Sequence, residues 1–282
     1  MRSLGELGFD VTLGDCVRRL RTRGYLSGSD EERGDELNEA FRDDEVEAVF
    51  CVTGGYGTPR MLPYVDYQLV KSKPKVFLGY SDITALHIAL NEKSGMVTFH
   101  GPVITDMGSE FTEYTERCFL RATATAEPLG EITNPVDGPI IKTITDGEAR
   151  GKLIGGNISL MAATMGTPYE IDTKGKILFV EEVDDPPYLI DRNLTNLWLA
   201  GKLHDAAGII VGEILRSKPR EDEASLSVWE MLRDRIGSLG KPAVYGFCCG
   251  HGTHRLTLPI GVEARLDATH GKLWIEESAT VP

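Results

Sequence analysis

Three polar residues of the kinds that form a hydrolytic site each follow a buried, strand-like run. Ser81 stands in the corner "GYSD" after "KVFL", Glu181 comes directly after "ILFV", and His251 lies between two glycines after "AVYGFCC". Acyl transfer needs a nucleophile, a base and a group that orients the base. The chain order Ser, Glu, His is one of the known convergent orders. We therefore predict that these three residues converge in space.

The corner at Ser81 has two interpretations. A serine before an apolar-periodic helix is a standard N-cap, and the motif alone favours that role. Gly79 supports a chemical role because it permits a tight strand-to-helix elbow at the sheet edge where α/β proteins place ligands. Ile83 argues against it, since it replaces the second glycine of a G-x-S-x-G elbow. We expect Ser81 to occupy a cap position and also to carry the reactive hydroxyl.

The carboxylate and the imidazole both have competitors. Adjacent strand residues face opposite sides, so only one of Glu181 and Glu182 can point inward. The acidic pair at 184–185 could ligate a divalent metal through oxygen atoms, or could be a solvated loop. His254 competes with His251, whose flanking glycines favour an exposed ring that other groups can approach closely.

A glycine-rich segment, "CVTGGYGTP" at 51–59, follows another apolar run. Glycines at the end of a buried strand leave backbone N–H groups free to point at an anion or a developing oxyanion. A plain βα turn explains the segment at least as well. The spacing matches neither G-x-x-x-x-G-K-[ST] nor G-x-G-x-x-G, which argues against a phosphate loop.

Composition restricts the classes of function. The 282 residues carry 30 Lys and Arg against 43 Asp and Glu, a net charge of −13, which argues against a nucleic-acid partner. The sequence has no apolar run of membrane-spanning length and no signal-peptide core at its start, so we expect a cytoplasmic protein. Five cysteines without metal-site spacing are predicted to be reduced thiols. Cysteine chemistry at 248–249 is a weaker alternative because the elbow carries serine.

Strand-like runs alternate with helical spacing, which predicts an α/β protein of two domains. Strands are expected at 9–14, 46–55, 75–81 and 96–102 in the first half, with a helix at 30–43. The Rossmann-like N-terminal domain is expected over 1–130, a linker over 131–147, and a smaller α/β domain over 148–282. Doubly wound sheets usually begin with a strand that becomes central, and we expect that first strand to be absent here.

Several long motifs, in order, resemble the LD-carboxypeptidase family, which includes the microcin-immunity peptidases. They are "GGYGTPRMLPYVDY", "PKVFLGYSDITALHIAL", "TFHGP", "GGNISLMAATMGTPY", "ILFVEEVDDPPYLIDRNLTNLWLAG" and "GFCCGHGTHRLTLPIG". The resemblance implies a Rossmann-like domain joined to a smaller α/β domain, usually in a homodimer, with the active site between the domains. It also implies a serine peptidase that cuts an L–D bond, typically in the murein tetrapeptide, and releases a terminal D-amino acid.

The resemblance assigns roles to residues of this chain. Ser81 is the nucleophile, Glu181 the carboxylate and His251 the base. Backbone N–H groups of Asp82 and Gly55 are the oxyanion donors. It implies no metal and no organic cofactor. Further substrate-binding candidates are Gly54, Tyr56, Arg60 and Arg192, the two arginines on charge alone.

One departure from the family pattern leaves the substrate open. Members commonly carry arginine immediately before "GGYG", where this chain has Thr53. The group that holds the substrate's terminal carboxylate or its diaminopimelate is therefore not assigned by the resemblance. A peptidase of the immunity type that cleaves a peptidyl- or aminoacyl-nucleotide conjugate is one alternative. A catalytically impaired, truncated homologue is the other.

Overall fold

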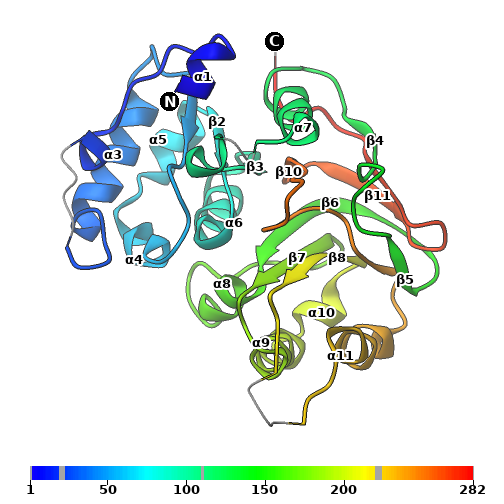
Figure 1. Ribbon diagram of the computed structural model, residues 1–282. Coiled ribbons are helices and arrows are strands. Elements are labelled where there is room, and N and C mark those ends of the chain that lie inside the picture. The colour runs from blue at the N-terminus through cyan, green and yellow to red at the C-terminus, as the bar shows by residue number, and fades with distance from the viewer. Residues whose placement is uncertain (1, 19–22, 109–110, 220–223, 282) are drawn as a thin grey trace.

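Two lobes, one around each of two sheets, make up the computed structural model (Figure 1). The smaller sheet has the order β1-β2-β3-β10, in which the first three strands are parallel and β10 is antiparallel to β3. Its strands are β1 (Ala48–Phe50), β2 (Val76–Gly79), β3 (Thr98–His100) and β10 (Leu258–Ile260). The structure describes residues 2–18, 23–108, 111–219 and 224–281.

Helices of the first half of the chain pack around this smaller sheet. The expected helix at 30–43 is confirmed as α3, which Ser29 and Glu32 begin with a reciprocal capping box. The apolar residues Phe41 and Phe77 lie fully buried between helix and sheet. The helices are α1 (Arg2–Glu6), α2 (Asp15–Arg18), α3 (Asp30–Arg42), α4 (Thr58–Met61), α5 (Tyr67–Ser72), α6 (Thr84–Ser94) and α7 (Glu113–Thr123).

The larger sheet has the order β4-β12-β11-β6-β7-β8-β9-β5, with β6 to β9 parallel in its centre. Buried aliphatic side chains of these central strands pack against helices on one face. The strands are β4 (Gly130–Ile132), β5 (Lys142–Thr145), β6 (Glu148–Asn157), β7 (Ile177–Val183), β8 (Gly208–Leu215), β9 (Ala243–Tyr245), β11 (Glu263–Asp267) and β12 (Lys272–Ile275). The helices are α8 (Ile158–Ala163), α9 (Pro187–Leu199), α10 (Lys202–Asp205) and α11 (Val228–Arg235).

The lobes meet where α6 approaches the carboxyl end of β6. The Asn157 N–H donates to the Thr84 hydroxyl oxygen at 2.9 Å, which joins the two lobes directly. A Cβ on Gly156 would lie 2.5 Å from that hydroxyl oxygen, so only glycine permits the approach. The carboxyl ends of β2, β6 and β7 therefore face one seam.

The α/β fold class is confirmed, but the strand expected at 9–14 is wrong. Those residues form neither helix nor strand. They are held by side-chain packing, since the Phe9 ring lies 5.7 Å from that of Phe50 and 6.0 Å from that of Phe119. Apolar alternation in this segment reflects packing on the core and not pairing in a ladder.

The division into 1–130, 131–147 and 148–282 stays a prediction. Strands β4 and β5, which lie partly or wholly within 131–147, form the two edges of the larger sheet. Strand β10 lies within 148–282 but pairs with β3 and so belongs to the smaller sheet. No helix in the described ranges is both long enough and apolar enough to cross a membrane.

Two buried histidines lie below the corner that follows β2. The His87 Nε2 and the Gly79 carbonyl oxygen are 2.8 Å apart, and His100 has no hydrogen-bond partner for either ring nitrogen among the described residues. Burial lowers the pKa of His87 to about 4 and holds the pKa of His100 well below its usual range. Both rings are therefore neutral parts of the core at neutral pH.

We expect His87 to make folding sensitive to acid. Its pKa is lower in the folded than in the unfolded chain, so the unfolded chain binds more protons as the pH falls from 6.5 towards 4. The free energy of unfolding should fall by about 3 kcal/mol over that window on account of this ring. Urea unfolding of wild type and His87→Gln at pH 7 and pH 4.5 measures it. An unchanged pH dependence in the variant would contradict the assignment.

Candidate active site

Ser81 lies at a strained elbow between β2 and α6. Its backbone φ is 66°, in the left-handed region that residues other than glycine, asparagine and aspartate rarely adopt. A Cβ on Gly79 would lie 3.0 Å from Ile83 and 3.1 Å from Cys51, so the missing side chain lets the turn close. The elbow predicted from Gly79 is present.

The expected capping role of Ser81 is wrong. Ser81 is the first residue of a 3-10 turn, Ser81–Ile83, and neither that turn nor α6 has a side-chain cap. The N-cap positions of these two helices are Tyr80 and Ile83, and Ser81 stands at neither. The hydroxyl is thus left free of that hydrogen bond.

The glycine-rich loop packs directly on this elbow. A Cβ on Gly54 would lie 2.9 Å from the Ser81 Cβ and 3.1 Å from its Oγ. The Thr58 N–H donates to the Asp82 carboxylate at 2.7 Å, which ties the far end of the loop to the elbow. Burial raises the pKa of Asp82. Gly55, with φ of 105°, is exposed at the tip of the loop.

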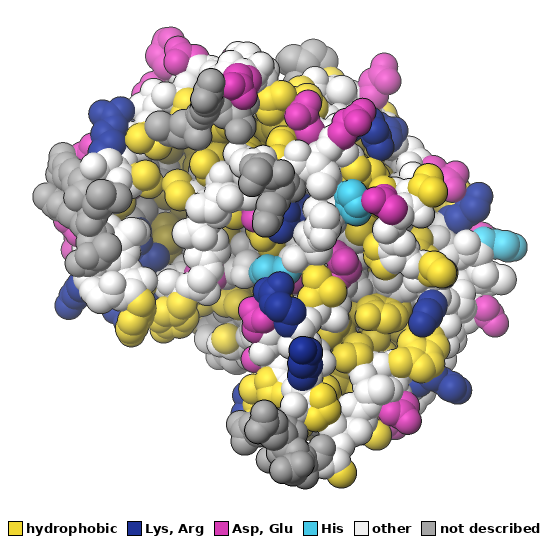
Figure 2. All heavy atoms as spheres, in the orientation of Figure 1, with side chains coloured by type: hydrophobic (Ala, Val, Ile, Leu, Met, Phe, Trp, Pro, Cys, Tyr) yellow, Lys and Arg dark blue, Asp and Glu magenta, His cyan; other side chains and the backbone are white. Residues whose placement is uncertain are grey.

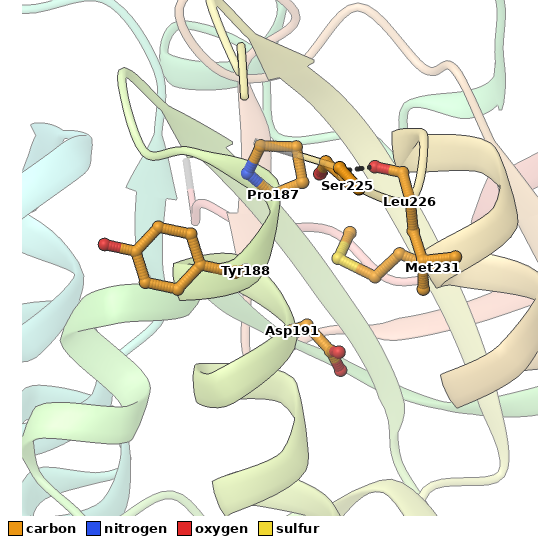
Figure 3. A pocket seen from close by; sticks show the side chains of 7 residues that line it. Pro187, Tyr188, Asp191, Ser225, Leu226 and Met231 are labelled. Atoms are coloured by element: carbon orange, nitrogen blue, oxygen red, sulfur yellow. Dashed lines mark hydrogen bonds between the residues drawn. The ribbon is translucent and has the colours of Figure 1, made fainter. Parts of the chain in front are cut away.

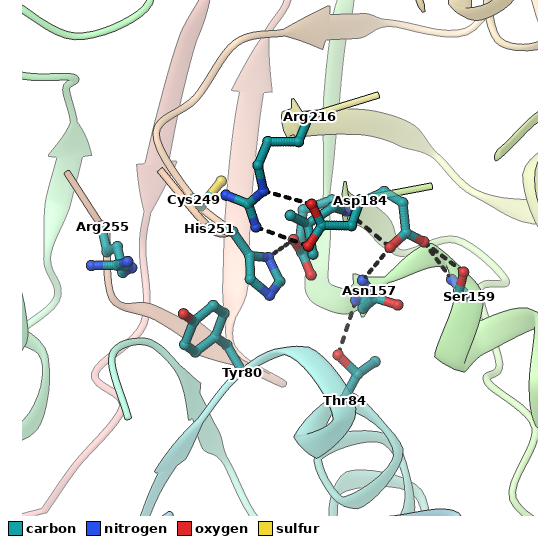
Figure 4. A network of polar contacts seen from close by, with 12 residues as sticks. Tyr80, Thr84, Asn157, Ser159, Asp184, Arg216, Cys249, His251 and Arg255 are labelled. Atoms are coloured by element: carbon teal, nitrogen blue, oxygen red, sulfur yellow. Dashed lines mark hydrogen bonds and ion pairs between the residues drawn. The ribbon is translucent and has the colours of Figure 1, made fainter. Parts of the chain in front are cut away.

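Glu181 and His251 form a hydrogen-bonded pair at the end of β7. The Nδ1 of His251 lies 2.8 Å from Oε2 of Glu181, a carboxylate that is fully buried (Figure 4). The other oxygen, Oε1, has no partner among the described residues. A Cβ on Gly250 would lie 2.9 Å from Oε2, so glycine is needed for this approach. The histidine thus depends on both the carboxylate and its glycine neighbour.

Tyr80 brings the pair next to the elbow. Its ring centroid lies 4.7 Å from that of His251, and Ser81 follows it in the chain. With Nδ1 on Glu181, Nε2 is the nitrogen that can serve a hydroxyl. No hydrogen bond joins Ser81 to His251 in the described part of the chain. Such bonds are often long before substrate binds.

The competing carboxylate and histidine have other partners. Glu182 accepts hydrogen bonds from the Asn157 side chain at 2.8 Å and from the Ser159 N–H at 2.9 Å, on the opposite side of the strand. His254 contacts Thr112 at 3.1 Å and Asp137 at 3.2 Å. These bonds place both competitors in structural networks.

The metal and thiol alternatives receive no geometric support. Within the described residues no group of three or more His, Cys, Asp or Glu side chains is arranged to hold a metal ion. Burial raises the pKa of Cys248 to about 12 and that of Cys249 well above its usual value. Both side chains are therefore thiols and not thiolates at neutral pH.

The expected substrate-binding arginines lie elsewhere or are already paired. Arg60 donates to Asp30 through Nε at 2.9 Å and through Nη2 at 2.8 Å. Arg192 is exposed on α9. Tyr56 is 59% exposed, and its ring packs edge-on against Tyr25. Of the four predicted substrate-binding residues, Gly54 is the one that the structure places against Ser81.

Sequence reasoning missed a second carboxylate under the histidine loop. Glu213 lies on β8, and a Cβ on Gly252 would come within 2.2 Å of its Oε2. Burial raises the pKa of Glu213 to about 7, against a smaller opposing effect of Arg255. His251 is thus flanked by two glycines, of which Gly250 packs on the fully buried Glu181 and Gly252 on the half-buried Glu213. A charged residue inside the apolar run "IIVGEI" was the available signal.

An ion pair at the ends of β7 and β8 was also missed. Arg216 donates to both oxygens of Asp184, and Figure 4 shows the pair beside His251. Figure 2, in the orientation of Figure 1, shows histidine, basic and acidic side chains gathered near the middle of this face. A cavity of about 150 Å³, lined by residues that include Pro187, Leu226 and Met231, lies apart from Ser81 and His251 between α9 and α11 (Figure 3).

Comparison with known sequences places both lobes in one family. Residues 1–101 match the LD-carboxypeptidase N-terminal domain, and residues 150–266 match the LD-carboxypeptidase C-terminal domain. A probable murein peptide carboxypeptidase of Bacillus subtilis is 43% identical over 97% of this chain and 84% of its own length. A putative carboxypeptidase of Streptomyces coelicolor is 38% identical over 93% of this chain and 82% of its own.

Solved structures agree with this result. A muramoyltetrapeptide carboxypeptidase from Oxalobacter formigenes superposes with a TM-score of 0.85 at 29% identity, covering 99% of this chain and 94% of that chain. The microcin C7 self immunity protein MccF has a TM-score of 0.90 at 24% identity, covering 99% of this chain and 90% of that chain, and shares the fold.

Gly54→Ala tests the contact between the loop and the elbow. The added methyl group would meet the Ser81 side chain, so we expect a fluorophosphonate to label Ser81 at least about tenfold more slowly than in wild type. Gly108→Ala, at a glycine with open space around it, is the matched control and should label at the wild-type rate. Equal rates in both variants would show that the contact does not position the hydroxyl.

Proposed function

This chain belongs to the LD-carboxypeptidase family, and on that premise we propose that it is a serine carboxypeptidase that cuts an L–D peptide bond and releases a terminal D-amino acid. The observation that carries the proposal is the buried Glu181–His251 pair, which lies against the residue that precedes Ser81. Of the three proposed catalytic residues, Ser81 follows β2, Glu181 lies on β7 and His251 lies in the loop after β9.

The proposed reaction begins with proton transfer. His251 takes the proton of the Ser81 hydroxyl through Nε2 while Oγ attacks the scissile carbonyl carbon. Glu181 holds the tautomer at Nδ1 and stabilises the imidazolium that forms. The imidazolium then gives its proton to the departing amine of the D-amino acid. Water, activated by the same imidazole, attacks the acyl-enzyme, which releases the shortened peptide and frees Ser81.

The backbone N–H groups of Asp82 and Gly55 are proposed as the oxyanion donors. Asp82 is the second residue of a 3-10 turn, a position whose N–H the turn itself does not use. Gly55 stands in the loop whose neighbouring glycine packs on Ser81. Each such donor contributes about 3 kcal/mol to the transition state in serine hydrolases.

The proposed substrate is a murein tetrapeptide, with D-alanine as the released product. Support comes from the names of two relatives, the murein peptide carboxypeptidase of B. subtilis and the muramoyltetrapeptide carboxypeptidase of O. formigenes. Peptidoglycan recycling in the cytoplasm and a homodimeric assembly belong to the same proposal.

A nucleotide conjugate is the second candidate substrate. MccF structures include complexes with glutamyl sulfamoyl guanosine and aspartyl sulfamoyl adenosine. A MccF-like protein from Bacillus anthracis is 31% identical over 98% of this chain and 89% of that chain, with a TM-score of 0.85. Thr53, at the position where arginine is common, is the feature of this chain that keeps this substrate open.

Ser81→Ala tests the reaction. Purified wild type should release D-alanine from the murein tetrapeptide, and the variant should lose at least about a thousandfold in kcat because no nucleophile remains. Ser72→Ala, at an exposed serine on α5, is the matched control and should keep wild-type activity. Mass spectrometry of the products and fluorophosphonate labelling of Ser81 are the readouts.

The same assay separates the candidate substrates. Wild-type cleavage of an aminoacyl sulfamoyl adenylate, with the tetrapeptide left intact, would favour the nucleotide conjugate. A folded wild type that cleaves neither compound and takes no fluorophosphonate label would overturn the proposed enzyme.

A further inference from the structure

We propose that Arg216 binds the terminal carboxylate of the substrate and that Asp184 orients its guanidinium. This inference rests on the proposed function, because it names the residue that makes that site a carboxypeptidase. The resemblance left this role unassigned, since Thr53 stands where arginine is common.

Arg216, like Ser81, is a residue type that rarely adopts the left-handed backbone region, and Asp184 shares that conformation. Among the residues that the structure describes, Ser81, Asp184 and Arg216 are the three non-glycine residues with positive φ, at 66°, 64° and 52°. Asp184 and Arg216 directly follow the ends of the neighbouring strands β7 and β8, and the Asp184 N–H donates to the Leu215 carbonyl at 3.1 Å. Strain of this kind concentrates at functional sites.

The ion pair does not explain the strain by stabilising the fold. Arg216 donates to Asp184 through Nε at 2.6 Å and through Nη2 at 3.0 Å, but the two side chains are 58% and 65% exposed. Exposed pairs contribute little to stability. What the pair does provide is orientation, since two parallel bonds fix the plane of the guanidinium.

Part of that guanidinium is free to bind an anion. Nε and one N–H of Nη2 are used by Asp184, while Nη1 forms no hydrogen bond with any described residue. Five N–H donors in a planar fork match a carboxylate in two-point geometry. Arg216 can therefore accept a second carboxylate without releasing Asp184.

The pair stands next to the reacting groups. Figure 4 shows the Arg216 guanidinium and His251 on the same side of Asp184. Asp184 directly follows β7, the strand that carries Glu181, and Glu181 is the hydrogen-bond partner of His251. The terminal carboxylate of a substrate lies one residue beyond the bond that is cut. The protein group that binds this carboxylate must therefore lie no farther from Ser81 and His251 than the length of one substrate residue.

Other arginines near the site are less suited to this role. Arg60 is held by Asp30, and Arg192 is exposed on α9. Arg255 is nine-tenths buried and faces Asp106 at 3.5 Å, with its guanidinium near the Tyr80 ring. Its Nε and Nη1 are buried and have no hydrogen-bond partner among the described residues, whereas the 58% exposed Arg216 offers its donors on the solvent side.

Two substrates that differ in one group provide the test. Wild type, Arg216→Gln and Arg216→Lys are assayed on the tetrapeptide with a terminal D-alanine and on its terminal carboxamide. We expect Arg216→Gln to raise KM for the acid about tenfold or more with a smaller change in kcat, and to leave the carboxamide kinetics unchanged. Arg216→Lys should recover part of the loss because it restores the charge without the fork.

Arg150→Gln is the matched control. Arg150 is also an exposed arginine paired with a carboxylate, Glu276, but lies near the amino end of β6, away from the seam. It should behave as wild type on both compounds. Melting temperatures of all variants check that each is folded.

A binding measurement separates this inference from the proposed function. In Ser81→Ala, calorimetry should show tighter binding of the acid than of the carboxamide, and adding Arg216→Gln should abolish that difference. If wild type hydrolyses neither compound while this difference in binding holds, the proposed function fails and the carboxylate site stands. Equal losses on the acid and the carboxamide would overturn the role of Arg216. So would a substrate in which the diaminopimelate carboxylate is amidated, if the effect of Arg216→Gln depended on that carboxylate and not on the terminal one.

Discussion

The site depends on one buried hydrogen bond, that between Glu181 and His251. A carboxylate without access to water is costly unless a partner compensates it, and only one of its oxygens has such a partner among the described residues. The imidazole is therefore held in one orientation and one tautomer. Because the Tyr80 ring packs on that imidazole, the same bond also fixes the distance between the histidine and the elbow at Ser81.

Glycine makes each of these close approaches possible. Gly54 packs on Ser81, Gly250 on Glu181, and Gly156 on Thr84 across the seam between the lobes. A methyl group at any of the three would come within 3.0 Å of an atom that the site or the seam needs. The glycines of the motifs therefore allow contact between elements, in addition to any role in turning the chain.

The chain alternates between the lobes more than a linear division into domains suggests. β10, late in the sequence, completes the smaller sheet, while β4 and β5 form the edges of the larger one. The hydroxyl of Thr84 receives the N–H of Asn157 at the junction. Residues from both halves thus set the geometry of the seam where Ser81, Glu181 and His251 lie.

The sequence alone determined the α/β class and the helix over 30–43, because buried runs and helical spacing leave local signals. Glycine-flanked polar residues after such runs also singled out Ser81, Glu181 and His251, which remain the proposed catalytic residues. It could not show that 9–14 packs without a ladder, since alternation looks the same in both cases. Nor could it show that Glu213 lies under Gly252, or that Arg216 pairs with Asp184 beside the histidine. Those contacts join residues far apart in the chain, and only the pairing of strands in the folded sheet brings them together.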